Sequence, residues 1–248
     1  MLLYTTLAPW YPLLTPLEDY VEEGATFRKM LLDALGERPA GRRWSLLELG
    51  AGAGHNAHYL QDDFDLCLTD LAPEMLALAS KNCPDARIEA GDMRTLRLGQ
   101  TFDAVFVHDA VSYLRGEADL AALIATAAVH LRPGGVLLIS PDYVTESFEQ
   151  ENEEDSSEDG DRSLRYHAWV NPADDAGYSV DYVFITKEGA APPVVYQERH
   201  LEGLYPRATW ERALSQAGFQ RRPPHAWRHS EVERDLEVFL AILGEPKG

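Results

Sequence analysis

The sequence predicts an α/β protein built on a doubly wound parallel sheet. Between residues 44 and 140, short apolar runs alternate with segments of helical periodicity, and each run is hydrophobic on both faces. Strands that are apolar on both faces are typical of a parallel sheet sandwiched between helices. Beyond residue 140 polar and apolar residues alternate, which indicates an added antiparallel sheet.

The elements of the parallel sheet follow one another in a regular order. Apolar runs predict strands at 45–49, 64–69, 87–90, 102–108 and 136–140. Helical patterns fall between them, at 54–61, 73–81 and 117–131. Pro73 suits the first turn of its helix, because the N–H that proline lacks has no partner there. Pro133-Gly134-Gly135 is expected to end the last of these helices.

The part of the chain after residue 140 begins with an acidic segment. In residues 146–161, nine of sixteen side chains are acidic and none is basic. We expect a mobile loop there, because the segment cannot bury enough apolar surface to offset the entropy of ordering. Three antiparallel strands follow, at 164–170, 178–186 and 194–201. A helix at 206–217 and a last strand at 237–243 return the chain to the main sheet, so the antiparallel strands are an insertion.

Composition narrows the class of function. The chain has 248 residues, with 22 Lys and Arg against 41 Asp and Glu, a formal charge of −19. Binding to nucleic acid requires clustered cations, so neither nucleic acid nor an anionic membrane is expected as a partner. Two cysteines cannot form a disulfide framework, and no apolar run is long enough to span a bilayer. The apolar N-terminus has no cationic start, so we expect no signal peptide and a cytoplasmic location.

Three glycines follow the first strand and open a helix. Gly50, Gly52 and Gly54 form G-x-G-x-G, whereas the dinucleotide fingerprint places its third glycine one residue later. Glycine permits a sharp turn and a close approach of a ligand to the backbone. Asp70 ends the second strand, where a carboxylate can accept hydrogen bonds from both hydroxyls of a ribose. This combination favours a nucleoside ligand without phosphates over a plain turn with a helix-capping aspartate.

Five successive segments resemble the motifs of class I S-adenosylmethionine-dependent methyltransferases. They read ELGAGAG, LTDLAPEML, AGDM, FDAVFVHDAVSYL and LRPGGVLLIS, in this order, within residues 44–141. The resemblance implies a Rossmann-like sheet of seven strands with its last strand antiparallel, and S-adenosyl-L-methionine as cofactor. No metal is expected, because the eight histidines show no ligand spacing with a third partner.

The resemblance also implies a role for individual residues. Gly50, Gly52 and Gly54 would lie beneath the methionine portion and the ribose, and Glu48 would orient the loop or the cofactor's amino group. The remaining cofactor-binding residues would be Asp70 at the ribose diol, Leu71 and Met75 beside the adenine, Asp92 at adenine N6, Met93 packing there and His108 beside the sulfonium.

The regions flanking the motifs resemble small-molecule methyltransferases related to sugar N-methyltransferases. An N-terminal helical lid would place Tyr20 and Arg28 at the cofactor carboxylate and Tyr11 there or over the methyl group. The inserted strands would roof the acceptor pocket, with candidate lining residues Tyr113, Tyr143, Arg165, His167, Trp169, His200 and Tyr205. The expected regions are 1–43 (helical lid), 44–141 (cofactor-binding core), 142–205 (acidic loop and β lid) and 206–248 (final helix and strands).

The reaction implied by the resemblance is an in-line methyl transfer to N or O of a small molecule. Alignment and water exclusion would supply most of the catalysis, and an amine acceptor would need a general base. Candidate catalytic residues are His108 and Asp109 after the fourth strand and His167 in the inserted sheet, with His200 as a further possibility.

Nucleic-acid methyltransferases of this fold commonly carry an [N/D/S]-P-P-[Y/F] motif after the fourth strand. This chain has His108-Asp109-Ala110-Val111 at that place, so a DNA or RNA substrate is not expected.

Two other readings stay open at this point. The chain could be a nicotinamide-dependent oxidoreductase, which the glycine spacing disfavours. It could also be a non-catalytic regulatory protein that keeps the fold and binds the cofactor. The aromatic N-terminus leaves open a homodimer.

Overall fold

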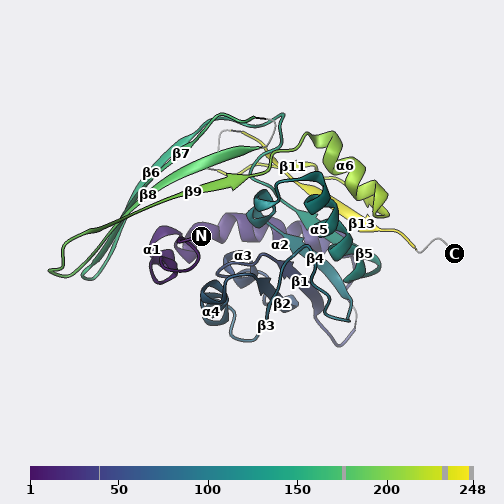
Figure 1. The fold of residues 1–248 in the computed structure, drawn as a ribbon. Coiled ribbons are helices and arrows are strands. Elements are labelled where there is room, and N and C mark those ends of the chain that lie inside the picture. Colours follow the sequence, from purple (N-terminus) through teal and green to yellow (C-terminus); the bar gives the residue numbers. More distant parts are fainter. Residues whose placement is uncertain (39, 175–176, 231–233, 246–248) are drawn as a thin grey trace.

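The fold is a seven-stranded sheet with a second, antiparallel sheet arching over one of its ends (Figure 1). The computed structural model describes all residues except 39, 175–176, 231–233 and 246–248. The order of the main sheet is β10-β13-β5-β4-β1-β2-β3, and β13 runs antiparallel to both of its neighbours. The predicted Rossmann-like sheet with an antiparallel last strand is thereby confirmed.

The strands of the main sheet lie close to their predicted positions. They are β1 (Trp44–Leu49), β2 (Phe64–Asp70), β3 (Arg87–Ala90), β4 (Phe102–Val107), β5 (Leu131–Ile139), β10 (Phe219–Arg221) and β13 (Phe239–Leu243). The longer helices are α2 (Val21–Leu35), α4 (Pro73–Asn82), α5 (Glu117–Val129) and α6 (Arg207–Gln216), and α3 (His55–His58) is a single turn. The short β10 was not predicted, and α3 is shorter than the helix expected at 54–61.

Helices cover both faces of the main sheet. Apolar residues of α5 and α6, among them Leu123 and Trp210, pack on one face in a buried cluster. Residues of α2 and α4, among them Phe27 and Ala79, pack on the other. This two-sided cover explains why each strand is apolar on both faces.

Pro133-Gly134-Gly135, which were expected to end the preceding helix, lie inside β5. Leu131 pairs with Phe102, and Val136 pairs with Ala104, so the residues between them bulge out of the ladder. A bulge tolerates the missing N–H of proline and the positive φ of Gly134, 74°.

The inserted sheet has four strands, one more than predicted. They are β6 (Asn152–Asp159), β7 (Arg162–Val170), β8 (Tyr178–Glu188) and β9 (Val194–Glu202), all antiparallel. The expectation of a mobile loop at 146–161 is therefore wrong for β6, which pairs with β7 along its whole length. Because β6 is an edge strand exposed to water, its backbone forms the ladder while its acidic side chains stay solvated.

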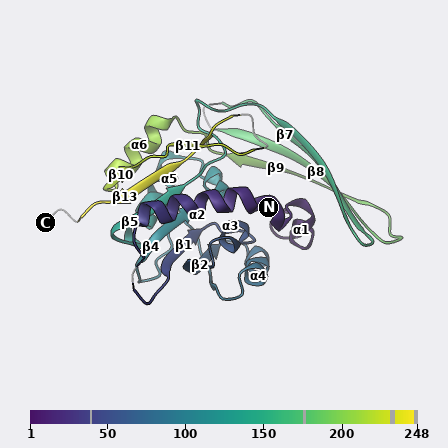
Figure 2. The ribbon, with the colours of Figure 1, turned by 180° about the vertical axis from the view of Figure 1, so that it is seen from behind.

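The N-terminal segment fills the space beneath the inserted sheet. It contains η1 (Ala8–Trp10), α1 (Tyr11–Leu14) and η2 (Leu17–Tyr20), which precede α2. Leu3, Leu7 and Leu13 pack with Leu164 and Phe184 of the inserted sheet in one buried cluster. Figures 1 and 2 show α1 under β6–β9 from both sides, with the C-terminus at the opposite end of the molecule.

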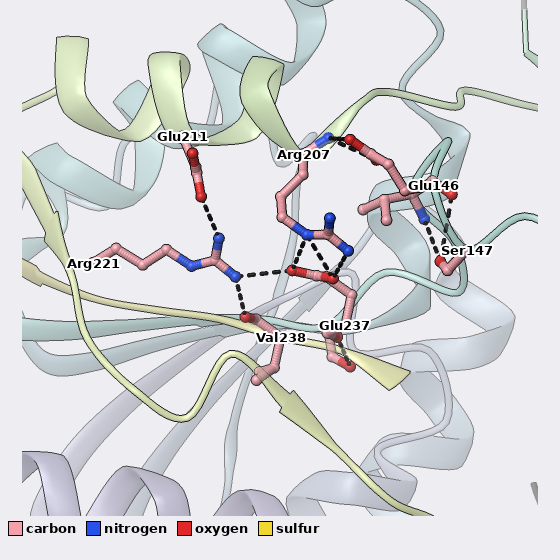
Figure 3. A network of polar contacts seen from close by, with 9 residues as sticks. Glu146, Ser147, Arg207, Glu211, Arg221, Glu237 and Val238 are labelled. Carbon is pink, nitrogen blue, oxygen red and sulfur yellow. Dashed lines mark hydrogen bonds and ion pairs between the residues drawn. The ribbon is translucent and has the colours of Figure 1, made fainter. Parts of the chain in front are cut away.

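A buried carboxylate joins the C-terminal elements to the main sheet (Figure 3). Glu237 is 5% exposed and belongs to β12 (Leu236–Glu237), which pairs with β11 (Ala226–Trp227). Its oxygens accept hydrogen bonds from Arg207 Nε and Nη2 at 3.1 and 2.8 Å, and from Arg221 Nη2 at 2.8 Å. The backbone N–H of Arg207 donates to Glu146, which ties α6 to the segment after β5.

Candidate functional site

A cavity of about 820 Å³ lies between the carboxyl ends of the parallel strands and the inserted sheet. Residues at the ends of β1, β2 and β4 form its floor, and β7, β8 and the N-terminal segment form its walls and roof. Eight of the chain's 11 tyrosines line it, together with seven carboxylates. Among the described lining residues, Arg234 is the one lysine or arginine. The cavity is therefore aromatic and acidic.

The glycine loop forms one end of this cavity. Gly50 and Gly52 line it with φ of 75° and 54°, a region that favours glycine. A Cβ at Gly50 would lie 2.3 Å from the Cβ of Ala110, so a side chain there does not fit. Asp70 lies beside the loop and accepts hydrogen bonds from the backbone N–H of Gly52 at 2.9 Å and of Ala72 at 2.8 Å.

Glu48 is a buried carboxylate with an unused acceptor. It is 3% exposed, lines the cavity, and its Oε2 has no hydrogen-bond partner among the residues that the structure describes. Burial, aided by the charges of Asp70 and Glu23 and opposed by His108, raises the pKa of Glu48 to about 8. A cationic ligand group beside Oε2 would satisfy this carboxylate.

His108 follows β4 and lies between two carboxylates. Its Nε2 is 3.0 Å from Asp109 Oδ1 and 3.5 Å from Glu23 Oε1, and Glu23 also accepts a hydrogen bond from Asn56 at 2.6 Å. Burial opposes its ionisation, but Asp109 and Glu23 outweigh burial and raise the pKa of His108 to about 10. The imidazole is therefore protonated at neutral pH, which argues against His108 as the general base.

Three carboxylates meet beyond His108, at the side of the cavity facing the inserted sheet. Asp142 accepts a hydrogen bond from Ser112 Oγ at 3.0 Å. Burial, together with the charges of Asp109 and Glu202, raises the pKa of Asp142 well above its usual range, and Asp109 and Asp142 share a hydrogen bond. Burial also raises the pKa of Glu202, which is hydrogen-bonded to Tyr178. A cationic ligand group that binds beside these three carboxylates would favour their ionised forms. The proton that Asp109 and Asp142 share would then be released.

Most of the sequence-predicted site residues line the cavity. Those that do are Tyr11, Tyr20, Glu48, Gly50, Gly52, Asp70, Leu71, Met93, His108, Asp109, Tyr113 and Tyr143. The lining residues that sequence reasoning missed include Tyr4, Asp142, Tyr166, Tyr178, Tyr182, Glu202 and Arg234.

Several predicted cofactor contacts lie outside the cavity. The guanidinium of Arg28 binds Asp63 at 2.6 Å, so it does not reach a ligand carboxylate. Asp92 accepts hydrogen bonds from the backbone and guanidinium of Arg94, and only its neighbours Gly91 and Met93 line the cavity. Met75 is fully buried and packs under the loop.

Gly54 also lies outside the cavity, at the start of α3. A Cβ there would be 3.3 Å from Ala79 Cβ, so Gly54 serves the packing of α3 on α4.

The inserted sheet presents the opposite face of β7 from the one predicted. Arg165 is exposed, and His167 lies 3.1 Å from Glu154 Oε2 and stacks with Trp169 on the outer face. Tyr166 and Ala168 line the cavity. The prediction of His167 as a catalytic residue and of Arg165 and Trp169 as lining residues is therefore wrong. The buried run Leu164, Tyr166, Ala168 is the signal that identifies the inner face.

Two further predicted lining residues are buried behind the cavity wall. The hydroxyl of Tyr205 donates to the backbone carbonyl of Leu114 at 2.6 Å. His200 is 1% exposed and lies behind Tyr113, which does line the cavity.

Among the described residues, no cluster of His, Cys, Asp and Glu has the arrangement of a metal site. The helices of the described part of the chain are too short or too polar to cross a bilayer. Cys67 and Cys83 are both buried and free.

Comparisons with known proteins agree with this geometry. Residues 46–135 match the family described as "Methyltransferase domain". A dTDP-3-amino-3,4,6-trideoxy-alpha-D-glucopyranose N,N-dimethyltransferase of Streptomyces venezuelae is 35% identical over 133 residues, 53% of this chain and 54% of that protein. A dTDP-3-amino-3,6-dideoxy-alpha-D-glucopyranose N,N-dimethyltransferase of Streptomyces fradiae is also 35% identical over 133 residues, 53% of this chain and 50% of its own. These matches span about half the length of the curated relatives.

Solved structures resemble the chain over most of its length. DesVI of Streptomyces venezuelae superposes with a TM-score of 0.78 at 25% identity, covering 91% of this chain and 92% of that one. SAM-bound CalS10, an amino pentose methyltransferase from Micromonospora echinaspora, gives 0.73 at 26% identity, covering 90% and 91%. The likeness therefore extends well beyond residues 46–135.

Proposed function

We propose that the chain is a methyltransferase of the class I fold and transfers methyl groups from S-adenosylmethionine to the amino nitrogen of a sugar. One observation carries the proposal. A single cavity holds both the glycine loop with Glu48 and Asp70 at one end, and a group of carboxylates and tyrosines at the other. The first end suits an adenosyl cofactor, and the second suits a cationic acceptor.

The cofactor end is argued from the shape and the unused polar atoms of the loop. Asp70, Leu71 and Met93 all line the cavity. In the proposal Asp70 accepts hydrogen bonds from the ribose hydroxyls, and Leu71 and Met93 flank the adenine. Oε2 of Glu48 is free to accept a hydrogen bond from the amino group of the methionine portion. Burial raises the pKa of Tyr11 to about 12, so its hydroxyl keeps its proton and can donate a hydrogen bond to the cofactor's carboxylate. In the proposal Tyr11 takes the role that was expected of Arg28. When bound, S-adenosylmethionine supplies a methyl group on a sulfonium that leaves as a neutral thioether.

The acceptor end favours nitrogen over oxygen. Asp109, Asp142 and Glu202 would attract an ammonium group, whereas a neutral alcohol gains little from them. Tyrosine rings around them, such as Tyr178 and Tyr182, offer cation–π contacts to the same group. The protein's part in catalysis is then to align the amine and exclude water.

The position of Arg234 in the cavity favours a methyl acceptor that also carries a negatively charged group. Its guanidinium lies 4.4 Å from the ring centroid of Tyr143, and its Nε is 3.8 Å from Glu151. Nε and Nη1 are buried without a hydrogen-bond partner in the described part of the chain. A phosphate would satisfy both atoms. We therefore infer a nucleotide-linked amino sugar, the class of acceptor in the names of the relatives.

The regions of the chain divide the two binding functions between them. We assign cofactor binding to residues 44–141, a lid that contacts both ligands to residues 1–43, and acceptor binding to residues 142–205. A cytoplasmic location is supported by two free cysteines, which are typical of a reducing compartment. The acidic composition supports a small-molecule partner over nucleic acid.

The test has a binding step and a turnover step. Calorimetry with S-adenosylhomocysteine and with NAD⁺ should show binding of the first alone; the reverse result would favour the oxidoreductase reading. The purified chain is then incubated with S-adenosylmethionine and dTDP-3-amino-3,4,6-trideoxy-α-D-glucose, with the 3-hydroxy analogue as matched control. Mass spectrometry should find one or two methyl groups added to the amine and none to the alcohol. Binding without transfer to any amino sugar nucleotide would favour a regulatory protein.

A further inference from the structure

Tyr113 connects the cavity to a chain of buried polar side chains. Its hydroxyl lies 2.9 Å from Nδ1 of His200 in β9. The other ring nitrogen of His200, Nε2, lies 3.0 Å from Oε1 of Glu198, two residues earlier in the same strand, which is an ion-pair distance although the contact falls outside hydrogen-bond geometry. Tyr113 lines the cavity, and His200 and Glu198 do not. The three side chains therefore lead from the acceptor end of the cavity into the inserted sheet.

The surroundings of Glu198 determine which nitrogen of His200 carries a proton. The backbone N–H groups of Leu2 and Leu3 donate to its two oxygens, both at 2.7 Å. A carboxylate satisfied in this way can only accept, so the short distance to Glu198 favours the tautomer that carries its proton on Nε2. Nδ1 is then an acceptor, and its donor is the hydroxyl of Tyr113.

The protonation states of the chain suit proton transfer. Burial lowers the pKa of His200, although Glu198 opposes this, so the ring is neutral near pH 7. Burial also raises the pKa of Tyr113 well above its usual range, so the phenol keeps its own proton. The other titratable groups that face His200 are Tyr4 and Tyr182, with ring centroids 5.9 and 4.8 Å away, and the amino group of Met1.

We propose that Tyr113, His200 and Glu198 form a proton relay for the acceptor amine, an inference that rests on the proposed function. The ammonium form of the acceptor gives a proton to Oη of Tyr113, while the hydroxyl proton of Tyr113 passes to Nδ1 of His200. The amine regains its lone pair, and the imidazolium is stabilised by Glu198. The relay releases its proton through Tyr113 once the product has left.

Tyr113 is the catalytic residue in this proposal, and His200 and Glu198 are positioning residues that act through it. The relay supplies a base close to the acceptor, whereas Asp109 and Glu23 raise the pKa of His108 and favour its protonated form. It also gives a reason for a histidine fully buried between two polar partners, where an apolar residue would otherwise pack.

The tautomer of His200 is the direct test, and it does not depend on the acceptor. We would record ¹⁵N NMR spectra of the histidine-labelled full chain, with His200 assigned from a His200→Gln sample. The wild type should show Nε2–H with Nδ1 as a hydrogen-bonded acceptor. Tyr113→Phe should move the Nδ1 resonance towards that of a free acceptor. Tyr196→Phe, which removes a hydroxyl from β9 away from the cavity, should leave it unchanged. An Nδ1–H tautomer in the wild type would overturn the relay.

Kinetics supply a second test, with dTDP-3-amino-3,4,6-trideoxy-α-D-glucose as acceptor. Wild-type kcat should fall at low pH as His200 becomes protonated. Tyr113→Phe should lower kcat by about 100-fold, within the usual range for general base catalysis, with KM little changed and the acidic limb lost. Glu198→Gln should move the limb to lower pH, and Glu158→Gln, an exposed acid of β6, should not.

The outcomes separate the relay from the function on which it rests. No methylation by the wild type would count against the proposed function, and the NMR result would still decide the relay. A normal kcat and acidic limb in Tyr113→Phe would contradict the relay even with the expected tautomer.

Discussion

Glu48 and Asp70 stand on either side of the glycine loop and contribute to binding in different ways. Asp70 is already hydrogen-bonded to the backbone of Gly52 and Ala72, which fixes its oxygens towards the cavity. Glu48 has an oxygen without a partner in the described chain and a pKa raised to about 8 by burial, with Asp70 and Glu23 adding to the effect. Asp70 is therefore held in position before the ligand binds, whereas Glu48 has an acceptor that a cationic ligand group can use.

Removal of the Asp70 carboxylate should weaken cofactor binding. Asp70→Ala is expected to lower the affinity for S-adenosylhomocysteine by about 1–3 kcal/mol, because hydrogen bonds to the ribose are lost. Calorimetry measures this loss, and Asp65→Ala, at the exposed start of the same strand, is the control. Unchanged affinity in a folded Asp70→Ala protein would remove the ribose assignment.

Ligand binding should also couple to the titration of Glu48. The folded-state pKa is raised, so below pH 8 the carboxyl is mostly protonated. The ammonium group of the ligand favours the ionised form, so binding releases a proton and the affinity should rise with pH towards 8, by at most about tenfold per pH unit. Calorimetry in buffers of different ionisation enthalpy detects the proton. Glu48→Gln should abolish its release, and a release that persists in this variant would show another group to be its source.

At the scale of elements, the sequence predicted the parallel strands well because burial on both faces leaves a continuous apolar run. It failed at β6, where an edge strand needs only backbone partners and its acidic side chains gave no sign of order. It also chose the wrong face of β7. Alternation fixes which residues share a face, but only the contact with Leu3 and Leu7, more than 150 residues away, decides which face is inside.

The C-terminal elements depend on Glu237, which is buried between Arg207 and Arg221 (Figure 3). Glu237→Ala leaves two guanidinium groups without their shared carboxylate and should lower the free energy of unfolding by about 3–5 kcal/mol. Glu211 is the second carboxylate that pairs with Arg221, and its side chain is 53% exposed, so Glu211→Ala should cost only about 0–1 kcal/mol. Urea denaturation followed by circular dichroism compares the two variants. Equal, small losses would show that the network does not hold α6 and β12 in place.

At the scale of the whole molecule, the cavity is assembled from segments far apart in the chain. The cofactor motifs lie within one continuous stretch, and most of the residues predicted there do line the cavity. The acceptor end depends on contacts such as that between Tyr4 and Tyr113, whose hydroxyls are 2.6 Å apart across 109 residues. Local patterns carry no information on such contacts, which is why Tyr4, Asp142 and Glu202 were not predicted.

A crystal structure of the chain with S-adenosylhomocysteine tests the central claim most directly. We predict that the adenosyl group lies between Leu71 and Met93, with its ribose at Asp70 and its amino group at Glu48. Its sulfur should point towards Tyr113 and the carboxylates of Asp109 and Asp142. An empty cavity at saturating ligand, or a ligand held by other side chains with the glycine loop untouched, would contradict the account.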